Sequence, residues 1–146
     1  MGVLMQVSAR NVFCGTVCAV HSGTVTDEIE IALPGGEKIV AVITSESTRT
    51  LALAEGREVC AIIKASQVIV LTDADDYMLS ARNQFTGRVK KLTRGFVNAE
   101  VVLEMPSGLE LMGIVSLDGA SRLRLEQGDS ATAVVKASSV IVAVRK

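Results

Sequence analysis

The stretch KASQVIV at Lys64–Val70 recurs almost unchanged as KASSVIV at Lys136–Val142. Shifting the chain by the same 72 residues aligns positions 8–70 with 80–142 without a gap, and 22 of the 63 paired positions are identical. The chain therefore contains two copies of one unit. Because two copies are too few for a solenoid, in which each repeat needs several neighbours, they predict two small domains.

We expect these domains at residues 6–71 and 79–144, joined by a linker at residues 72–78. The linker reads TDADDYM and is short, acidic and without apolar periodicity. It lacks the glycine and the glutamate that an EF-hand calcium loop carries at fixed spacing. It is therefore interpreted as a solvated tether.

Each copy has the pattern of a strand-rich domain, because Val, Ile and Thr dominate it. In the first copy Gly15 is expected to form a bulge or bend in the first strand, and PGGEK at residues 34–38 is a hairpin turn. One short helix follows the third strand, capped by Ser45 or Ser47 and ended by Gly56. The predicted fold is all-β, with two tandem OB-like five-stranded barrels, each with one short helix.

Composition argues against two classes of partner. The net charge is -1, and the aromatic residues are only three Phe and one Tyr. A protein that binds nucleic acid usually neutralises phosphates or stacks bases on aromatic side chains, so neither mode is expected here. No apolar run reaches the roughly 20 residues of a membrane span, and the first residues lack the pattern of a signal peptide. We therefore expect a cytoplasmic protein without a nucleic-acid or membrane partner.

The three cysteines, Cys14, Cys18 and Cys60, form no CxxC pair. This odd count favours reduced thiols over a disulfide framework. Cys14 and Cys18 are expected on one face of a strand, because an even number of positions separates them. No metal site is predicted, since the single histidine, His21, has no counterpart in the second copy.

The polar residues that both copies keep are rich in hydrogen-bond donors. They are Ser8, Arg10, Asn11, Lys64 and Ser66, with their counterparts Ser80, Arg82, Asn83, Lys136 and Ser138. Guanidinium, ammonium and hydroxyl groups together suit a small tetrahedral oxyanion. The small side chains of Ala65 and Ala137 leave the backbone N–H groups accessible to the same anion. A structural alternative stays open, in which SARN forms a turn, its arginine pairs with Glu28 or Glu100, and the lysine is solvated.

Catalysis is not expected. An enzyme usually needs an activated nucleophile or two carboxylates with separated pKa values. The copies share no His and no Cys, and the only matched acid is the pair Glu28 and Glu100. A Ser-Lys nucleophile pair is conceivable, but two such sites in a small duplicated barrel are implausible, so no catalytic residue is assigned.

Four motifs together resemble one family. SARN, PGGEK, ITSES and the closing KASxVI are similar to the molybdenum-pterin-binding (Mop) or molbindin family, part of the wider TOBE group. The resemblance covers nearly the whole chain twice, and the tandem copies look like the di-Mop molybdate storage proteins. It implies five-stranded OB-like barrels, assembly as a homotrimer, and molybdate or tungstate held between neighbouring barrels for storage, with no catalytic cofactor.

The resemblance also implies which residues bind the anion. Ser8, Arg10, Lys64 and Ser66 would bind it in the first copy, and Ser80, Arg82, Lys136 and Ser138 in the second. Asn11 and Asn83 would brace the turns. A neighbouring barrel would add a hydroxyl, from Thr44 or Ser45 in the first copy and from Ser116 in the second. The second copy departs from the pattern, because ITSES has become VSLDG and Asp118 opposes an anion, so the two classes of site are expected to differ in affinity.

Two other functions remain in view. The same unit could sense the oxyanion and regulate through a partner protein, since no helix-turn-helix pattern is present for direct DNA binding. A pterin ligand, which the family name suggests, would find few aromatic side chains to stack on.

Overall fold

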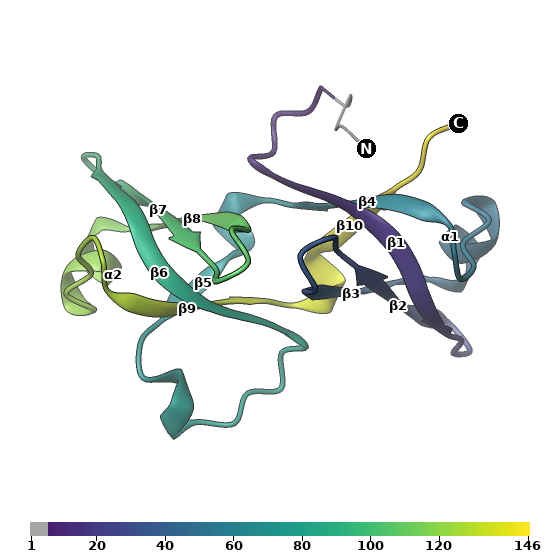
Figure 1. Cartoon of the computed structure of the whole chain (residues 1–146), viewed down its shortest axis with the longest axis horizontal. Helices are drawn as coiled ribbons and strands as arrows, with labels where there is room; N and C mark the ends of the chain where they lie inside the picture. The colour runs from purple at the N-terminus through teal and green to yellow at the C-terminus, as the bar shows by residue number, and fades with distance from the viewer. Residues whose placement is uncertain (1–5) are drawn as a thin grey trace. The chain divides into compact units, whose positions relative to one another are not determined.

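The computed structural model describes residues 6–146 (Figure 1). Within them the chain forms mostly β-strands. The first copy contributes β1 (Asn11–His21), β2 (Thr26–Ala32), β3 (Lys38–Thr44), α1 (Ser45–Thr50), β4 (Glu58–Ile63), the 3-10 turn η1 (Ala65–Gln67) and β5 (Ile69–Leu71). The linker carries the 3-10 turn η2 (Ala74–Asp76). The second copy contributes β6 (Asn83–Arg94), β7 (Asn98–Glu104), β8 (Glu110–Ser116), α2 (Leu117–Arg122), β9 (Ser130–Val135), the 3-10 turn η3 (Ala137–Ser139) and β10 (Val140–Ala143).

The strands form two five-stranded antiparallel sheets. The first sheet has the order β10-β4-β1-β2-β3, and the second has the order β5-β9-β6-β7-β8. In the first sheet β10 also approaches β3, and in the second β5 approaches β8, so each sheet curls toward closure. The predicted fold class, all-β with two five-stranded barrel-like sheets and one short helix in each copy, is confirmed.

The two copies exchange their last strands. β5 of the first copy pairs with β9 in the second sheet, and β10 of the second copy pairs with β4 in the first sheet. Among the described residues the compact units are therefore 6–64 together with 136–146, and 65–135. The boundaries of these units differ from those of the sequence copies at 6–71 and 79–144. The reason is that the chain passes from the first unit to the second after Lys64 and returns to the first at Lys136.

The core of each unit consists of aliphatic side chains from alternate strand positions. Along β2 the buried residues include Ile29 and Ile31, and along β7 they include Val101 and Leu103, all four of them 0–1% exposed. This alternation is the expected pattern of a sheet with one buried face. In keeping with the few aromatic residues in the sequence, the core is built mainly of Val, Ile, Leu and Ala, and Phe13 and Phe85 are its aromatic members.

Of the bulge or bend predicted at Gly15, the bulge was wrong. The register of β1 shifts at Cys18, between Val17 and Ala19, so the bulge is not at Gly15. A Cβ atom at Gly15 would collide with the backbone oxygen of Ala32 on β2, and this close approach explains the glycine. The equivalent Gly87 faces the oxygen of Glu104 in the same way.

The short helix also begins and ends differently from the prediction. The N-cap of α1 is Thr44, whose hydroxyl accepts from the Ser47 N–H at 3.1 Å, and not Ser45 or Ser47. The helix ends at Thr50, and Gly56 lies in the next turn, with a φ of +92° that favours glycine.

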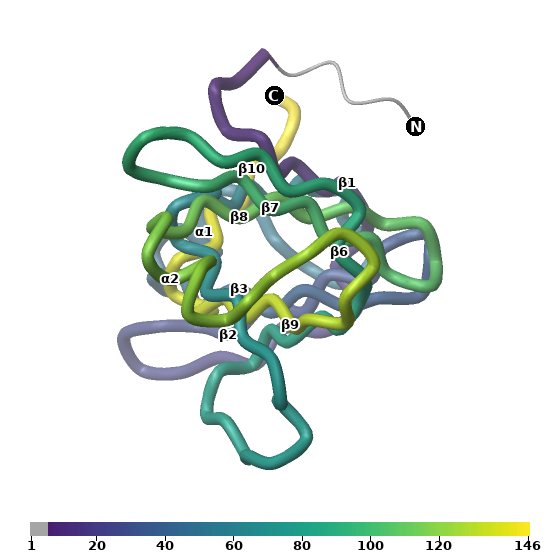
Figure 2. The backbone as a smooth tube through the Cα atoms, turned by 90° about the vertical axis from the view of Figure 1, so that its left-hand side faces the viewer, coloured from purple at the N-terminus to yellow at the C-terminus, as the bar shows by residue number. Residues whose placement is uncertain are grey.

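The linker forms a loop of the second unit and runs outward from its strands in both views (Figures 1 and 2). No helix in the described part of the chain is long and apolar enough to cross a membrane. The prediction that the chain begins without a signal peptide concerns residues 1–5 in part, and these lie outside the described residues.

Candidate oxyanion-binding site

The first SARN motif lies at one end of the first sheet. Asn11 opens β1, is 2% exposed, and is aligned with Ile63, the last residue of β4. Arg10, which is exposed, directly precedes Asn11 and so lies next to the start of β1. The exposed Lys64 directly follows Ile63, so the guanidinium and the ammonium group are carried by the ends of two paired strands.

The second KAS motif reaches the same end of the first sheet. Val140, which opens β10, is aligned with Ile63, and the turn η3 directly precedes it and packs against β3. Within this motif Ala137 is buried, whereas Lys136 and Ser138 are exposed. The alanine thus anchors the turn, and the two polar residues on either side of it lie at the surface.

The second sheet repeats this arrangement. Asn83 is 1% exposed and is aligned with Val135, the last residue of β9, so Arg82 precedes β6 and Lys136 follows β9. The turn η1 contacts β8 and leads into β5, which pairs with the end of β9. Here Ala65 is the buried residue, and Ser66 is exposed.

Strand exchange therefore regroups the candidate residues. The first unit contains Ser8, Arg10, Asn11 and Lys64 together with Lys136, Ala137 and Ser138, whereas the second contains Ser80, Arg82, Asn83, Ala65 and Ser66. Each SARN shares a unit with the Ala-Ser turn of the other copy. The resemblance implied that Ser66 and Arg10, which belong to the same copy, act together. In the structure these two residues belong to different units.

The candidate hydroxyls lie at the opposite end of the strand ladder. Thr44 ends β3 and is aligned with Thr26, at the start of β2, and this part of the sheet adjoins the His21 end of β1. Ser116 ends β8 in the same way, aligned with Asn98. Both are helix N-caps, and Ser116 accepts from the Gly119 N–H at 2.9 Å.

Ser45 differs from Thr44 because its hydroxyl has a partner inside the unit. It donates to Oδ1 of Asp27 at 2.7 Å, and the N–H of Gly23 donates to the same oxygen at 3.0 Å. Asp27 is 5% exposed. Hydrogen bonds from Thr48 and then Ser45 lower the pKa of Asp27 below its ordinary value. Of the two alternatives in the first copy, Thr44 is the exposed one and is the equivalent of Ser116.

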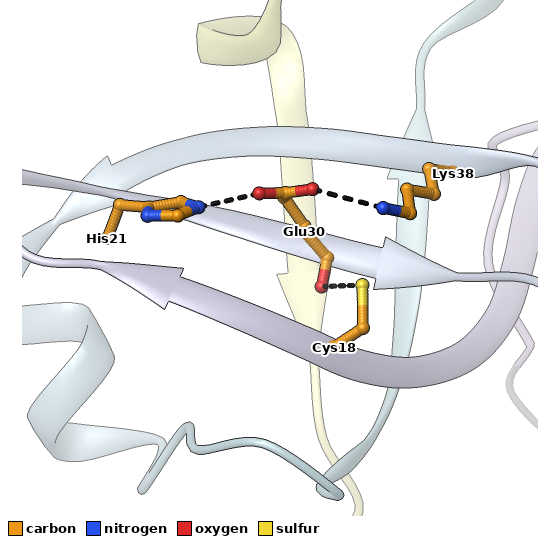
Figure 3. Close-up of polar contacts among 4 residues, drawn as sticks. All are labelled: Cys18, His21, Glu30 and Lys38. Carbon is orange, nitrogen blue, oxygen red and sulfur yellow. Dashed lines mark hydrogen bonds and ion pairs between the residues drawn. The ribbon is translucent and has the colours of Figure 1, made fainter.

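A second polar cluster crosses the first three strands (Figure 3). Nε2 of His21 lies 2.6 Å from a carboxylate oxygen of Glu30, and Nζ of Lys38 lies 3.5 Å from the other. The hydrogen bond from His21 is the main cause that lowers the pKa of Glu30. Cys18 donates to the backbone oxygen of Glu30 at 3.4 Å. The cluster links β1, β2 and β3 and is interpreted as structural.

The prediction of three reduced thiols was wrong. Cys14 and Cys60 are aligned partners on β1 and β4 and form a disulfide, and only Cys18 is free. Cysteine spacing along the sequence does not reveal that these two residues lie opposite each other. Within residues 6–146, no group of three or more His, Cys, Asp or Glu is arranged to hold a metal ion.

Sequence reasoning missed two clusters that paired substitutions between the copies would have revealed. Cys14 and Cys60 both become threonine, as Thr86 and Thr132. The residues around the buried Asp27 change together as well, because Asp27, Ser45 and Thr48 all become apolar, as Ala99, Leu117 and Ala120. Concerted replacement of separated residues is the signal of a spatial contact.

Comparison with known proteins identifies the repeated unit. The TOBE domain family matches residues 7–70 and again residues 79–142. The chain is 50% identical to ModG, described as a cytoplasmic molybdate-binding protein, whose crystal structure contains bound molybdate. The two structures superpose with a TM-score of 0.93 over 97% of this chain and 100% of ModG.

Longer relatives contain the same region. The chain is 40% identical over 97% of its length to the molybdenum transport protein ModE of Herbaspirillum seropedicae, and covers 53% of it. It is 40% identical over 96% of its length to the molybdenum-pterin-binding protein MopA of Rhodobacter capsulatus, again covering 53%. The chain thus spans about half the length of the curated relatives it matches.

Proposed function

Because this chain belongs to the TOBE domain family and carries the domain twice, we propose that it binds molybdate or tungstate and stores it, contributing to molybdenum homeostasis. The observation that supports the proposal is that cationic residues kept in both copies lie next to aligned strand ends. Arg10 and Lys64 flank paired strands there, and Arg82 and Lys136 do so in the second sheet. The likeness to ModG over its full length supports the same ligand.

The donors suit a tetrahedral dianion. An arginine offers a planar fork of N–H groups, a lysine offers a compact charge, and Ser8, Ser66, Ser80 and Ser138 add neutral hydroxyls. Hydrogen bonds from charged donors to an anion are stronger than neutral ones. The buried Ala65 and Ala137 hold their turns so that backbone N–H groups add to the set, and the buried Asn11 and Asn83 brace the SARN segments.

We further propose that the sites are completed by assembly. Thr44 and Ser116 lie at the end of the strand ladder opposite the arginines. They therefore suit a ligand held by a neighbouring barrel, in a homotrimer whose sites lie between barrels. The protein acts in the cytoplasm, as ModG is described to do, and performs no catalysis with the ligand.

The first test is native mass spectrometry with and without molybdate. We expect a trimer that takes up several oxyanions, and loss of uptake in an Arg10→Ala, Arg82→Ala double variant. Each lost charge-assisted hydrogen bond costs about 1.5–3 kcal/mol, or roughly 10- to 150-fold in affinity. Arg57→Ala, an exposed arginine before β4 and away from Lys64, is the matched control. A protein that takes up neither molybdate nor tungstate would overturn the proposal.

A second candidate function is oxyanion sensing for a regulatory partner. The relatives described as ModE transcriptional regulators favour it, because the chain matches about half of each of them. Pull-down of a partner that binds only in the presence of molybdate would favour sensing. Storage predicts an oxyanion-loaded trimer without such a partner.

A further inference from the structure

The cross-strand disulfide joins the two strands that carry the candidate ligands of the first unit. Cys14 on β1 and Cys60 on β4 are aligned partners, and both are half-buried. Their neighbours Phe13 and Ala61 point into the core, so the two sulfur atoms lie on the outer face of the sheet. A small thiol reagent can therefore reach the bond.

The second copy has no thiol at this position. Its aligned pair is Thr86 and Thr132, whose hydroxyl oxygens lie 2.8 Å apart. A hydrogen bond between threonines depends on no redox partner, whereas a disulfide does. The third cysteine, Cys18, lies at the bulge, where it donates to the Glu30 backbone oxygen, and takes no part in the cross-link.

The cross-link lies close to the donor groups along the same strands. Asn11 and Ile63 are aligned three positions beyond Cys14 and Cys60, a distance of about 10 Å along a strand. Arg10 directly precedes Asn11, and Lys64 directly follows Ile63. A bond between the strands at the cysteine pair therefore restricts the relative movement of these two cationic residues.

We propose that the Cys14–Cys60 disulfide is a reversible switch that sets the oxyanion affinity of the site formed by Arg10 and Lys64, while the site of Arg82 stays constant. The inference rests on the proposed oxyanion binding. When the bond is formed, the two donors are held in place and less conformational freedom is lost on binding. When it is reduced, β1 and β4 keep their backbone pairing but separate more easily at their ends.

The chemistry is thiol–disulfide exchange with a low-molecular-weight disulfide such as oxidised glutathione. One cysteine thiolate attacks the reagent, forms a mixed disulfide and releases one thiol. The second cysteine then attacks the protein sulfur of that mixed disulfide and releases the second thiol. Overall two protein thiols and one RSSR give the protein disulfide and two RSH, and a dithiol reductant reverses the reaction.

The test is molybdate titration calorimetry of the full-length protein, equilibrated with oxidised glutathione or with a dithiol. Two classes of site are expected. Reduction should weaken one class by roughly 3- to 10-fold and leave the other unchanged. Mass spectrometry after alkylation should show two more modified cysteines, Cys14 and Cys60, in the reduced sample than in the oxidised one.

Matched variants identify the responsible residues. Cys14→Thr with Cys60→Thr copies the pair of the second unit and should remove the redox response, whereas Cys18→Ser should keep it. Arg10→Ala should eliminate the responsive class, and Arg82→Ala the constant one. If reduction changes the affinity of both classes equally, or of neither, the proposed switch is overturned while the proposed oxyanion binding stands. Absence of molybdate binding in both redox states would instead overturn the proposed function and the affinity control with it.

Amide hydrogen exchange adds a readout that does not need the ligand. Reduction should speed exchange at the first residues of β1 and the last residues of β4. The equivalent residues of β6 and β9 should not change. Unchanged exchange in the first unit would show that the bond does not restrict these strand ends, and would contradict the proposal even if affinity responds.

Discussion

At the scale of single residues, the buried carboxylate of Asp27 is the clearest difference between the units. It accepts from Ser45 and from the Gly23 N–H, and its surroundings keep its pKa below the ordinary value of 3.8. A carboxyl group whose pKa is lowered by folding stabilises the fold above its unfolded pKa. This contribution is lost as the pH falls through the lower, folded-state pKa.

Replacing the cluster by the residues of the second copy tests this effect. The variant Asp27→Ala, Ser45→Leu, Thr48→Ala should lose the acid-dependent part of the stability of the first unit. Urea denaturation between pH 7 and pH 2 should show the wild type losing stability relative to the variant below about pH 4. A constant difference at all pH values would contradict the assignment. Glu46→Gln, an exposed acid on the same helix, is the control.

The glycines of the first strand in each copy give a second prediction at this scale. Gly15→Ala or Gly87→Ala places a methyl group against a backbone oxygen of the neighbouring strand. Overpacking of this kind costs about 1–3 kcal/mol of unfolding free energy. Chemical denaturation should show this loss, whereas Thr16→Ala, at the exposed neighbouring position, should have a much smaller effect.

Sulfate competition tests the geometry of the donor set. Molybdate and sulfate share charge and shape, so only size separates them. Donors spaced for the larger anion leave stretched or unpaired groups around sulfate, at about 1–3 kcal/mol for each unsatisfied group. We expect weak competition in a molybdate titration with added sulfate. Comparable displacement by equimolar sulfate would contradict a site selected by size.

At the scale of strands, the disulfide closes a loop with a sequence separation of 46 residues. Loop closure of this length stabilises a fold by about 2–4 kcal/mol. The Cys14→Thr, Cys60→Thr variant should therefore unfold at lower denaturant than the oxidised wild type and close to the reduced wild type. If reduction leaves the unfolding midpoint of the wild type unchanged, the bond contributes nothing to stability.

The predictability of these elements follows from the range of the interactions that form them. Alternating apolar residues and the PGGEK turn are local patterns, so the strands, the hairpin and the short helix could be predicted. The bulge at Cys18 could not, because it depends on the register between β1 and β2. The bond between Cys14 and Cys60 likewise requires knowing which strands are neighbours.

The sequence could predict which residues belong to the candidate site, but it could not predict which of them share a unit. Preservation of SARN and KAS in both copies singled out the donors. Their grouping depends on strand exchange, and nothing in the sequence of Ile69–Leu71 states whether it pairs with β4 or with β9, since both copies end in almost the same residues. Because the two copies are so similar, the sequence does not show whether the last strand of each copy pairs within its own copy or with the other.

At the scale of the whole molecule, the exchange makes each unit dependent on both copies. A protease site inserted in the linker at Asp75 should permit cleavage without separation of the halves. Native electrophoresis should show one species after cleavage, and two peptides should appear only in urea. Halves that separate without denaturant would show that β5 and β10 do not hold the units together.

The exchange of β5 and β10 also has a genetic consequence. In a tandem protein whose copies fold independently, each copy accumulates substitutions that affect its own domain alone. Here a substitution in β5 or β10 alters the sheet that is otherwise built by the other copy, so each copy constrains the other's divergence. Duplication has thus produced two inherited segments that are selected together, and loss of either one removes part of both folded units.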